Sequence, residues 1–219
     1  MLESTSREKV LKKIRNALTD KVANPFPNLD FESPVYVQPA ETPEINFAHA
    51  FAAIGGHFVF CENEAALTAN LSSFVKELSL KNVFTADEKI AAYLQQAGIN
   101  FSSDQKSLVS GDVSFTRCEA LVARTGGILV SSRIQGGRKS VVASPVHAVI
   151  AYASQIVPDI KDALTHVRNF YRGQLPSMLS FLSGPSRTAD IEKTLVTGAH
   201  GPKAIYVFLL DDASSGTAV

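Results

Sequence analysis

The chain has 219 residues, of which 45% are hydrophobic and 19% charged, and its 21 basic residues balance its 21 acidic ones. This composition is typical of a globular protein with enough apolar side chains for a sizeable core. The balanced charge argues against nucleic acid as the main partner, because nucleic-acid binders usually carry a basic excess. No apolar run approaches the roughly 18 residues of a membrane span, and the charged amino-terminal segment lacks the apolar centre of a signal peptide. We therefore expect a cytoplasmic protein.

The amino-terminal segment predicts a helical arm. Thr5 and Glu8 fit a capping box, and apolar residues follow at helical spacing as far as Leu18. Residues 21–46 contain five prolines and no sustained periodicity, which indicates an extended segment. The chain is therefore divided into an N-terminal helix and proline-rich arm, residues 1–48, and an α/β domain, residues 49–219.

From residue 57 onward the pattern alternates between strands and helices. Apolar segments at 57–61 and 82–86 predict strands, and each is followed by a segment of helical periodicity. Further β-prone segments, a helix over 159–172, and strands over 178–184 and 204–212 complete the pattern. Such alternation is typical of a parallel sheet with helices on its faces. The expected fold is a three-layer α/β domain with a largely parallel sheet.

Cysteine and histidine form no metal-binding pattern in this sequence. Cys61 and Cys118 lie far apart in apolar stretches, which favours buried free thiols over a disulfide. There is no Cys-x-x-Cys pair, and the five histidines show no short metal-site spacing. We expect no metal and no iron–sulfur cluster to be bound by this chain itself.

The first candidate site is the segment FLSGPSRTADIEKTLVTGAHGPK, residues 181–203. A strand is expected to end there and a helix to begin near Ser186 or Thr188, with Asp190 and Glu192 in its first turn, where the helix dipole favours acids.

Helix capping does not explain Arg187, a cation placed where the helix dipole disfavours it. α/β sheets bind anions where strand ends meet helix starts, and an arginine there would suit a phosphate or carboxylate. In the structural alternative, Arg187 pairs only with Asp190 or Glu192. The candidate ligand-binding residues of this segment are Gly184, Ser186, Arg187, Thr188, Asp190 and His200.

The second candidate site runs from Glu119 to His147. Thr125, Gly126 and Gly127 predict a tight turn, and the following loop gathers basic residues, among them Arg138, with two more glycines. The loop lacks the register of a Walker phosphate loop, and a solvated hairpin tip is the alternative.

Two single residues of this second segment are further candidates. His147 follows Ser-Pro-x and is either a ligand-binding group or a core residue with satisfied hydrogen bonds. Glu119 precedes an apolar segment and is the candidate for a catalytic base or nucleophile.

Three segments together resemble the LUD-domain family, lactate-utilisation protein C type: SGPSRTADIEKTLVTGAHGP, ALVARTGGILVSS and SPVHAVIAYASQIV. The resemblance covers roughly residues 50–212. It implies a fold similar to that of sugar-phosphate isomerases and coenzyme A transferases, with ligands over the carboxyl ends of the sheet strands. Family members often have Ala-Glu-Thr-Gly-Thr where this chain has Arg124 and Gly127 on either side of Thr125-Gly126.

The resemblance also implies a role in oxidising L-lactate to pyruvate, together with two partner proteins that carry iron–sulfur clusters. The first hypothesis is therefore a subunit of such a system that binds a small anionic ligand. The alternative is a stand-alone transferase- or isomerase-like enzyme acting on a phosphorylated or acyl substrate, which the two basic, glycine-containing segments would favour.

Overall fold

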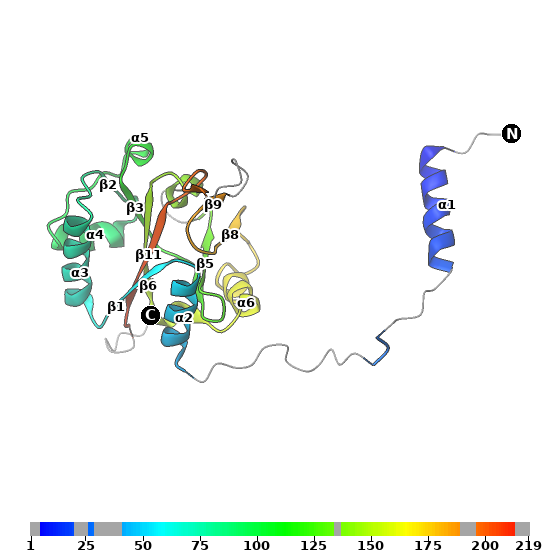
Figure 1. Ribbon diagram of the computed structural model, residues 1–219, viewed down its shortest axis with the longest axis horizontal. Coiled ribbons are helices and arrows are strands. Elements are labelled where there is room, and N and C mark those ends of the chain that lie inside the picture. Colours follow the sequence, from blue (N-terminus) through cyan, green and yellow to red (C-terminus); the bar gives the residue numbers. More distant parts are fainter. Residues whose placement is uncertain (1–4, 20–25, 29–40, 134–136, 189–195, 213–219) are drawn as a thin grey trace. The chain divides into compact units, whose positions relative to one another are not determined.

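The computed structural model describes residues 5–19, 26–28, 41–133, 137–188 and 196–212 (Figure 1). The chain divides into two units, residues 1–38 and 39–219. The first contains helix α1 (Ser6–Thr19), and no residue of this helix is buried. The predicted capping box is confirmed: Glu8 N donates to Thr5 Oγ1 over 3.3 Å, and Thr5 N donates to Glu8 Oε2 over 2.8 Å. Within the described residues, no helix is both long and apolar enough to cross a membrane.

Five parallel strands form the main sheet of the second unit, in the order β1-β11-β6-β3-β2. Their bounds are β1 (His57–Cys61), β2 (Val83–Phe84), β3 (Val113–Thr116), β6 (Val146–Tyr152) and β11 (Ala204–Leu210). The predicted parallel sheet is thus confirmed. The last strand in the chain, β11, lies between β1 and β6. Residues from the beginning and the end of this unit are therefore neighbours in the sheet.

Helices α3 (Glu64–Glu77) and α4 (Glu88–Gln96) cover one face of this sheet (Figure 1). Their first turns are capped by Asn63 and Asp87, whose side-chain oxygens accept hydrogen bonds from backbone N–H groups. Leu67 and Leu94, both fully buried, join a core with Phe115 of β3. The short helix α5 (Gln105–Val109) precedes β3.

A second sheet, in the order β7-β4-β5-β8, lies on the other side (Figure 1). It contains β4 (Ala120–Val122), β5 (Gly127–Ser131), β7 (Ile156–Val157) and β8 (Leu179–Leu182), with two antiparallel pairings and one parallel pairing. Its inner residues, such as Leu121, pack against Val149 and Val207 of the parallel sheet. Helix α6 (Ile160–Phe170) packs on its outer face through Ala163 and Val167.

Helix α2 (Pro43–Ala53) begins inside the segment that the prolines had indicated to be extended. Pro43 is the first helical residue, a position where proline is tolerated because its missing N–H would have no partner in the helix. Phe47 and Phe51 lie one turn apart, are fully buried, and stack with ring centroids 5.4 Å apart. The buried pair anchors α2 in the core between the two sheets.

The predicted helix near Ser186 or Thr188 is wrong at its start. Arg187–Thr188 forms strand β9, which pairs antiparallel with β10 (Val196–Thr197). Thr188 and Thr197, one in each strand, have β-branched side chains, which favour strands. Asp190 and Glu192, expected in the first turn, lie outside the described residues.

Candidate functional site

Gly184 and Arg187 lie against the carboxyl-terminal end of α2. Gly184 has φ +82°, and a Cβ there would lie 2.4 Å from the carbonyl oxygen of Ile54, the residue that caps α2. Arg187 Nη2 donates to the same oxygen over 3.4 Å. A cation is favourable at this end of a helix, because the last carbonyl groups carry partial negative charge. Arg187 thus has a structural contact, yet its side chain is exposed and a guanidinium has further donors to offer.

The rest of this segment folds into a compact loop around Ser186. Ser186 N donates to Pro202 O over 2.9 Å, and Gly198 N donates to Ser186 O over 2.8 Å. The side chain of Lys203 crosses Gly198, where a Cβ would lie 2.2 Å from Lys203 Cγ. His200 and Lys203 are exposed, so the described part of this loop carries three basic side chains, with Arg187 as the third. Lys203 was not predicted as a site residue, although it ends the same GAHGPK motif.

This basic loop lies at the amino edge of the parallel sheet. Lys203 N donates to Pro145 O over 2.7 Å, immediately before β6 and β11 begin. Ligands of α/β sheets usually bind outside the carboxyl ends of the strands. The placement that the family resemblance implied therefore does not apply to the loop around Arg187.

The Thr125-Gly126-Gly127 turn supports α2 from another side. Gly126 has φ +65°, and a Cβ there would lie 2.4 Å from Phe51 N and 2.5 Å from the carbonyl carbon of Ala50. Gly127 N donates to Thr125 Oγ1 over 3.3 Å, which closes the turn. This candidate and the Gly184–Arg187 segment both contact the second half of α2.

Arg124, which stands where family members often have glutamate, anchors α6. Its Nε and Nη2 atoms donate to the two carboxylate oxygens of Asp159 over 2.9 and 2.6 Å. Asp159 is the N-cap residue of α6, and the Arg124 guanidinium holds the pKa of its carboxyl below the usual value. The departure from the family pattern thus has a structural partner in this chain.

His147 and Arg138 are separate from the basic loop in their described contacts. His147 is completely buried in β6, with Nε2 2.8 Å from Thr116 Oγ1, and its Nδ1 has no hydrogen-bond partner among the described atoms. Burial lowers the pKa of His147 to about 4, so its ring is neutral at pH 7. Arg138 begins the short helix η1 (Arg138–Val141), and its Nη2 donates to Ser177 Oγ over 2.8 Å.

Glu119, the candidate base or nucleophile, joins the second sheet to α6. Its Oε1 accepts hydrogen bonds from Ser131 Oγ over 2.5 Å and from the Tyr171 hydroxyl over 2.8 Å. The guanidinium of Arg133 lies 5.1 Å from the centre of the Tyr171 ring. Burial and the contact with Glu119 raise the pKa of the Tyr171 hydroxyl. These contacts are those of a carboxylate that holds the end of α6.

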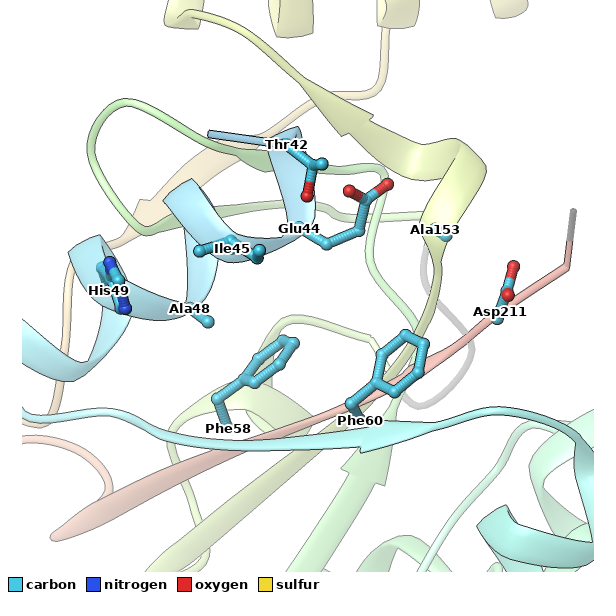
Figure 2. A pocket seen from close by; sticks show the side chains of 9 residues that line it. All are labelled: Thr42, Glu44, Ile45, Ala48, His49, Phe58, Phe60, Ala153 and Asp211. Atoms are coloured by element: carbon cyan, nitrogen blue, oxygen red, sulfur yellow. The ribbon is translucent and has the colours of Figure 1, made fainter. Parts of the chain in front are cut away.

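A pocket of about 580 Å³ lies at the opposite, carboxyl edge of the parallel sheet (Figure 2). Phe58 and Phe60 of β1 form one wall, and residues of the first half of α2 form the other. Ala153 follows β6 directly and Asp211 follows β11 directly, which places both at the strand ends. No residue of this pocket was predicted as a site residue. The signals that could have indicated it are the Phe-x-Phe alternation in β1 and the acids directly after the last strand.

The fold and these sites define an α/β protein with a five-stranded parallel sheet, a second mixed sheet, and a pocket at the carboxyl ends of the parallel strands. A family model described as the LUD domain matches residues 46–210. This chain belongs to the LUD-domain family.

Among its relatives is the lactate utilization protein C of Shouchella clausii, which is 37% identical over 103 residues, or 46% of this chain and 44% of that protein. The lactate utilization protein C 1 of Bacillus mycoides is 27% identical over 163 residues, covering 67% of this chain and 70% of that protein. The match to the first of these spans less than half of the relative. A DUF162 family protein from Deinococcus radiodurans has a similar fold, with a TM-score of 0.58 and 18% identity over 78% of this chain and 99% of that one.

Proposed function

We propose that this chain is a component of a lactate-utilisation system that oxidises L-lactate to pyruvate together with iron–sulfur partner proteins. The observation that carries the proposal is the family match over residues 46–210, joined to relatives that are named lactate utilization protein C. In this proposal the clusters belong to the partners.

The two cysteines of this chain do not suit a cluster. Cys61 and Cys118 are both buried, and they lie in the cores on opposite faces of the parallel sheet. Burial raises the pKa of both thiols, whereas a cluster is held by thiolates.

We further propose that the basic loop around Arg187 binds a small anion. Lactate, pyruvate and phosphate all carry the negative oxygens that an arginine recognises. Arg187, His200 and Lys203 are exposed on one loop, and its described residues, 183–188 and 196–203, contain no acid. Glu119, the candidate catalytic residue of the transferase or isomerase alternative, is bonded to Ser131 and Tyr171.

The lactate role is tested by deleting the gene in the source organism and growing the strain on L-lactate or on pyruvate as sole carbon source. We expect growth to be lost on L-lactate alone and restored by a plasmid copy. Lactate-dependent reduction of an electron acceptor in cell extracts should fall in parallel. Unimpaired growth and lactate oxidation in the deletion strain would contradict the role.

Anion binding is tested separately, by thermal unfolding of the purified full chain with lactate, pyruvate or phosphate. An anion present at about a hundred times its dissociation constant adds about 2.7 kcal/mol, or roughly 5–10 °C for a chain of this size. Arg187→Ala should abolish the shift, and Arg168→Ala, which removes an exposed arginine on α6, should retain it. Equal shifts in both variants would overturn the assignment to this loop.

A further inference from the structure

The carboxyl-edge pocket has the dimensions of a small-molecule site. Its volume of about 580 Å³ falls within the range of roughly 300–1,000 Å³ that such sites occupy. Figure 2 shows Ile45 and Ala48 of α2 facing Phe58 and Phe60 of β1 across the pocket, with Glu44 and Asp211 on the side next to Ala153. The pocket is therefore apolar through its middle and acidic at one end.

Its apolar walls remain open to solvent. Phe60 is 46% exposed and Ile45 is 44% exposed, although both belong to regular elements of the folded core. Covering two such side chains removes apolar surface from water, which favours the binding of a molecule with an apolar or aromatic body.

The charge at the acidic end of the pocket determines which kind of molecule can bind there. The aligned peptide dipoles of α2 contribute about half a positive charge at its amino terminus, where Thr42 makes no side-chain cap. Against this, Glu44 and Asp211 are both carboxylic acids, and both residues are partly buried. The nine lining residues include no lysine or arginine, and the one histidine, His49, is 3.2 Å from Glu41 at the outer rim. The described lining thus carries two acids and no basic side chain other than His49.

We propose that this pocket binds a small organic cation, with its ammonium group beside Glu44 and Asp211 and its apolar body between α2 and the phenylalanines of β1. A carboxylate such as lactate is disfavoured here by the same two acids. The proposal goes beyond the lactate role and concerns a different edge of the sheet from the basic loop. The two sites select opposite charges, so each can fail without the other.

A matched pair of probes tests the charge selection. Tryptamine and indole-3-propionate share an indole ring and an ethylene spacer and differ in the terminal group, which is an ammonium in the first and a carboxylate in the second. Each probe is titrated into the full chain in a calorimeter. We expect saturable binding of tryptamine, with an affinity at least about tenfold higher than the affinity for indole-3-propionate. Equal affinities, or no binding of tryptamine, would overturn the proposal.

Two variants locate the binding in the pocket. Glu44→Gln should weaken tryptamine by about fivefold while leaving indole-3-propionate unchanged or slightly tighter. Phe60→Ala should weaken both probes, since it removes shared apolar surface. Glu77→Gln, which neutralises an exposed acid at the end of α3, is the control and should bind tryptamine like the parent protein. A loss in Glu77→Gln equal to that in Glu44→Gln would show general charge attraction and contradict a built site.

Discussion

His147 of β6 and Thr116 of β3 are joined inside the protein by a hydrogen bond of 2.8 Å between Nε2 and Oγ1. Both side chains are buried, and they lie on adjacent parallel strands. The bond satisfies one nitrogen of a ring that burial keeps neutral, with a pKa of about 4. His147 is accordingly a core residue whose charge state links stability to pH.

The first prediction follows from this pKa. In the unfolded chain the histidine has a pKa near 6.5, so between about pH 6.5 and pH 4 the unfolded state binds more protons than the folded state. The free energy of unfolding is retained above pH 6.5 and falls as the pH drops through this window. At about pH 5 the loss is about 2 kcal/mol relative to about pH 7.5.

Urea unfolding of the parent protein and of His147→Gln at these two pH values measures the effect. Groups other than His147 titrate in both proteins and cancel in the comparison. We expect the stability difference between parent and variant to shift by about 2 kcal/mol in favour of the variant at the lower pH. A difference independent of pH would show that burial does not lower the pKa of His147.

Gly126 should tolerate no side chain, because α2 lies directly on it. Gly126→Ala would place a Cβ 2.4 Å from Phe51 N and 2.6 Å from Phe51 Cα, where only backbone movement gives relief. We expect a loss of more than about 3 kcal/mol in the free energy of unfolding. Gly98→Ala is the matched control: its φ of +68° is similar, and no atom lies within 4 Å of the added Cβ. That variant should lose only about 1 kcal/mol, and equal losses would refute the close contact with α2.

Arg124 and Asp159 should contribute unequally to stability. Asp159→Ala removes both the ion pair and the N-cap of α6, whereas Arg124→Ala removes the ion pair and leaves the N-cap in place. We expect the melting temperature to fall in both variants and further in Asp159→Ala. The melting temperature of Asp159→Asn, which keeps a capping oxygen, should lie between those of the other two variants. A larger effect of Arg124→Ala than of Asp159→Ala would contradict the capping role.

The Glu119 carboxylate should affect the pKa at which the Tyr171 hydroxyl titrates. Burial first, and the hydrogen bond to Glu119 second, raise the pKa of the Tyr171 hydroxyl. Glu119→Gln removes the negative acceptor, so the pKa of Tyr171 should fall toward its ordinary value of about 10. Ultraviolet absorbance of tyrosinate measures this, with Tyr171→Phe identifying the signal among the other tyrosines. An unchanged titration would show that Glu119 and Tyr171 are not bonded in solution.

The accuracy of the sequence predictions depended on how local each signal was. The capping box of Thr5 and Glu8 and the strand at His57–Cys61 are encoded by neighbours in the chain, and both are confirmed. The helix near Ser186 failed because a serine followed by acids suits a helix start, whereas Arg187 and Thr188 find strand partners several residues later. Pro43 was predicted to be part of an extended segment for a similar reason. The burial of Phe47 and Phe51, which a local pattern does not show, makes this proline the first residue of a helix.

By itself, the sequence determined the α/β class, the parallel sheet and the LUD-domain family, because periodicity and motif order are properties of the linear chain. Only the tertiary structure decided what the candidate residues contact. Arg187 meets Ile54 across 133 residues of chain, and the carboxyl-edge pocket forms where Phe60 of the first strand and Asp211 after the last meet. Such contacts depend on the order of strands in the sheet, and no local pattern in the chain specifies that β11 inserts between β1 and β6.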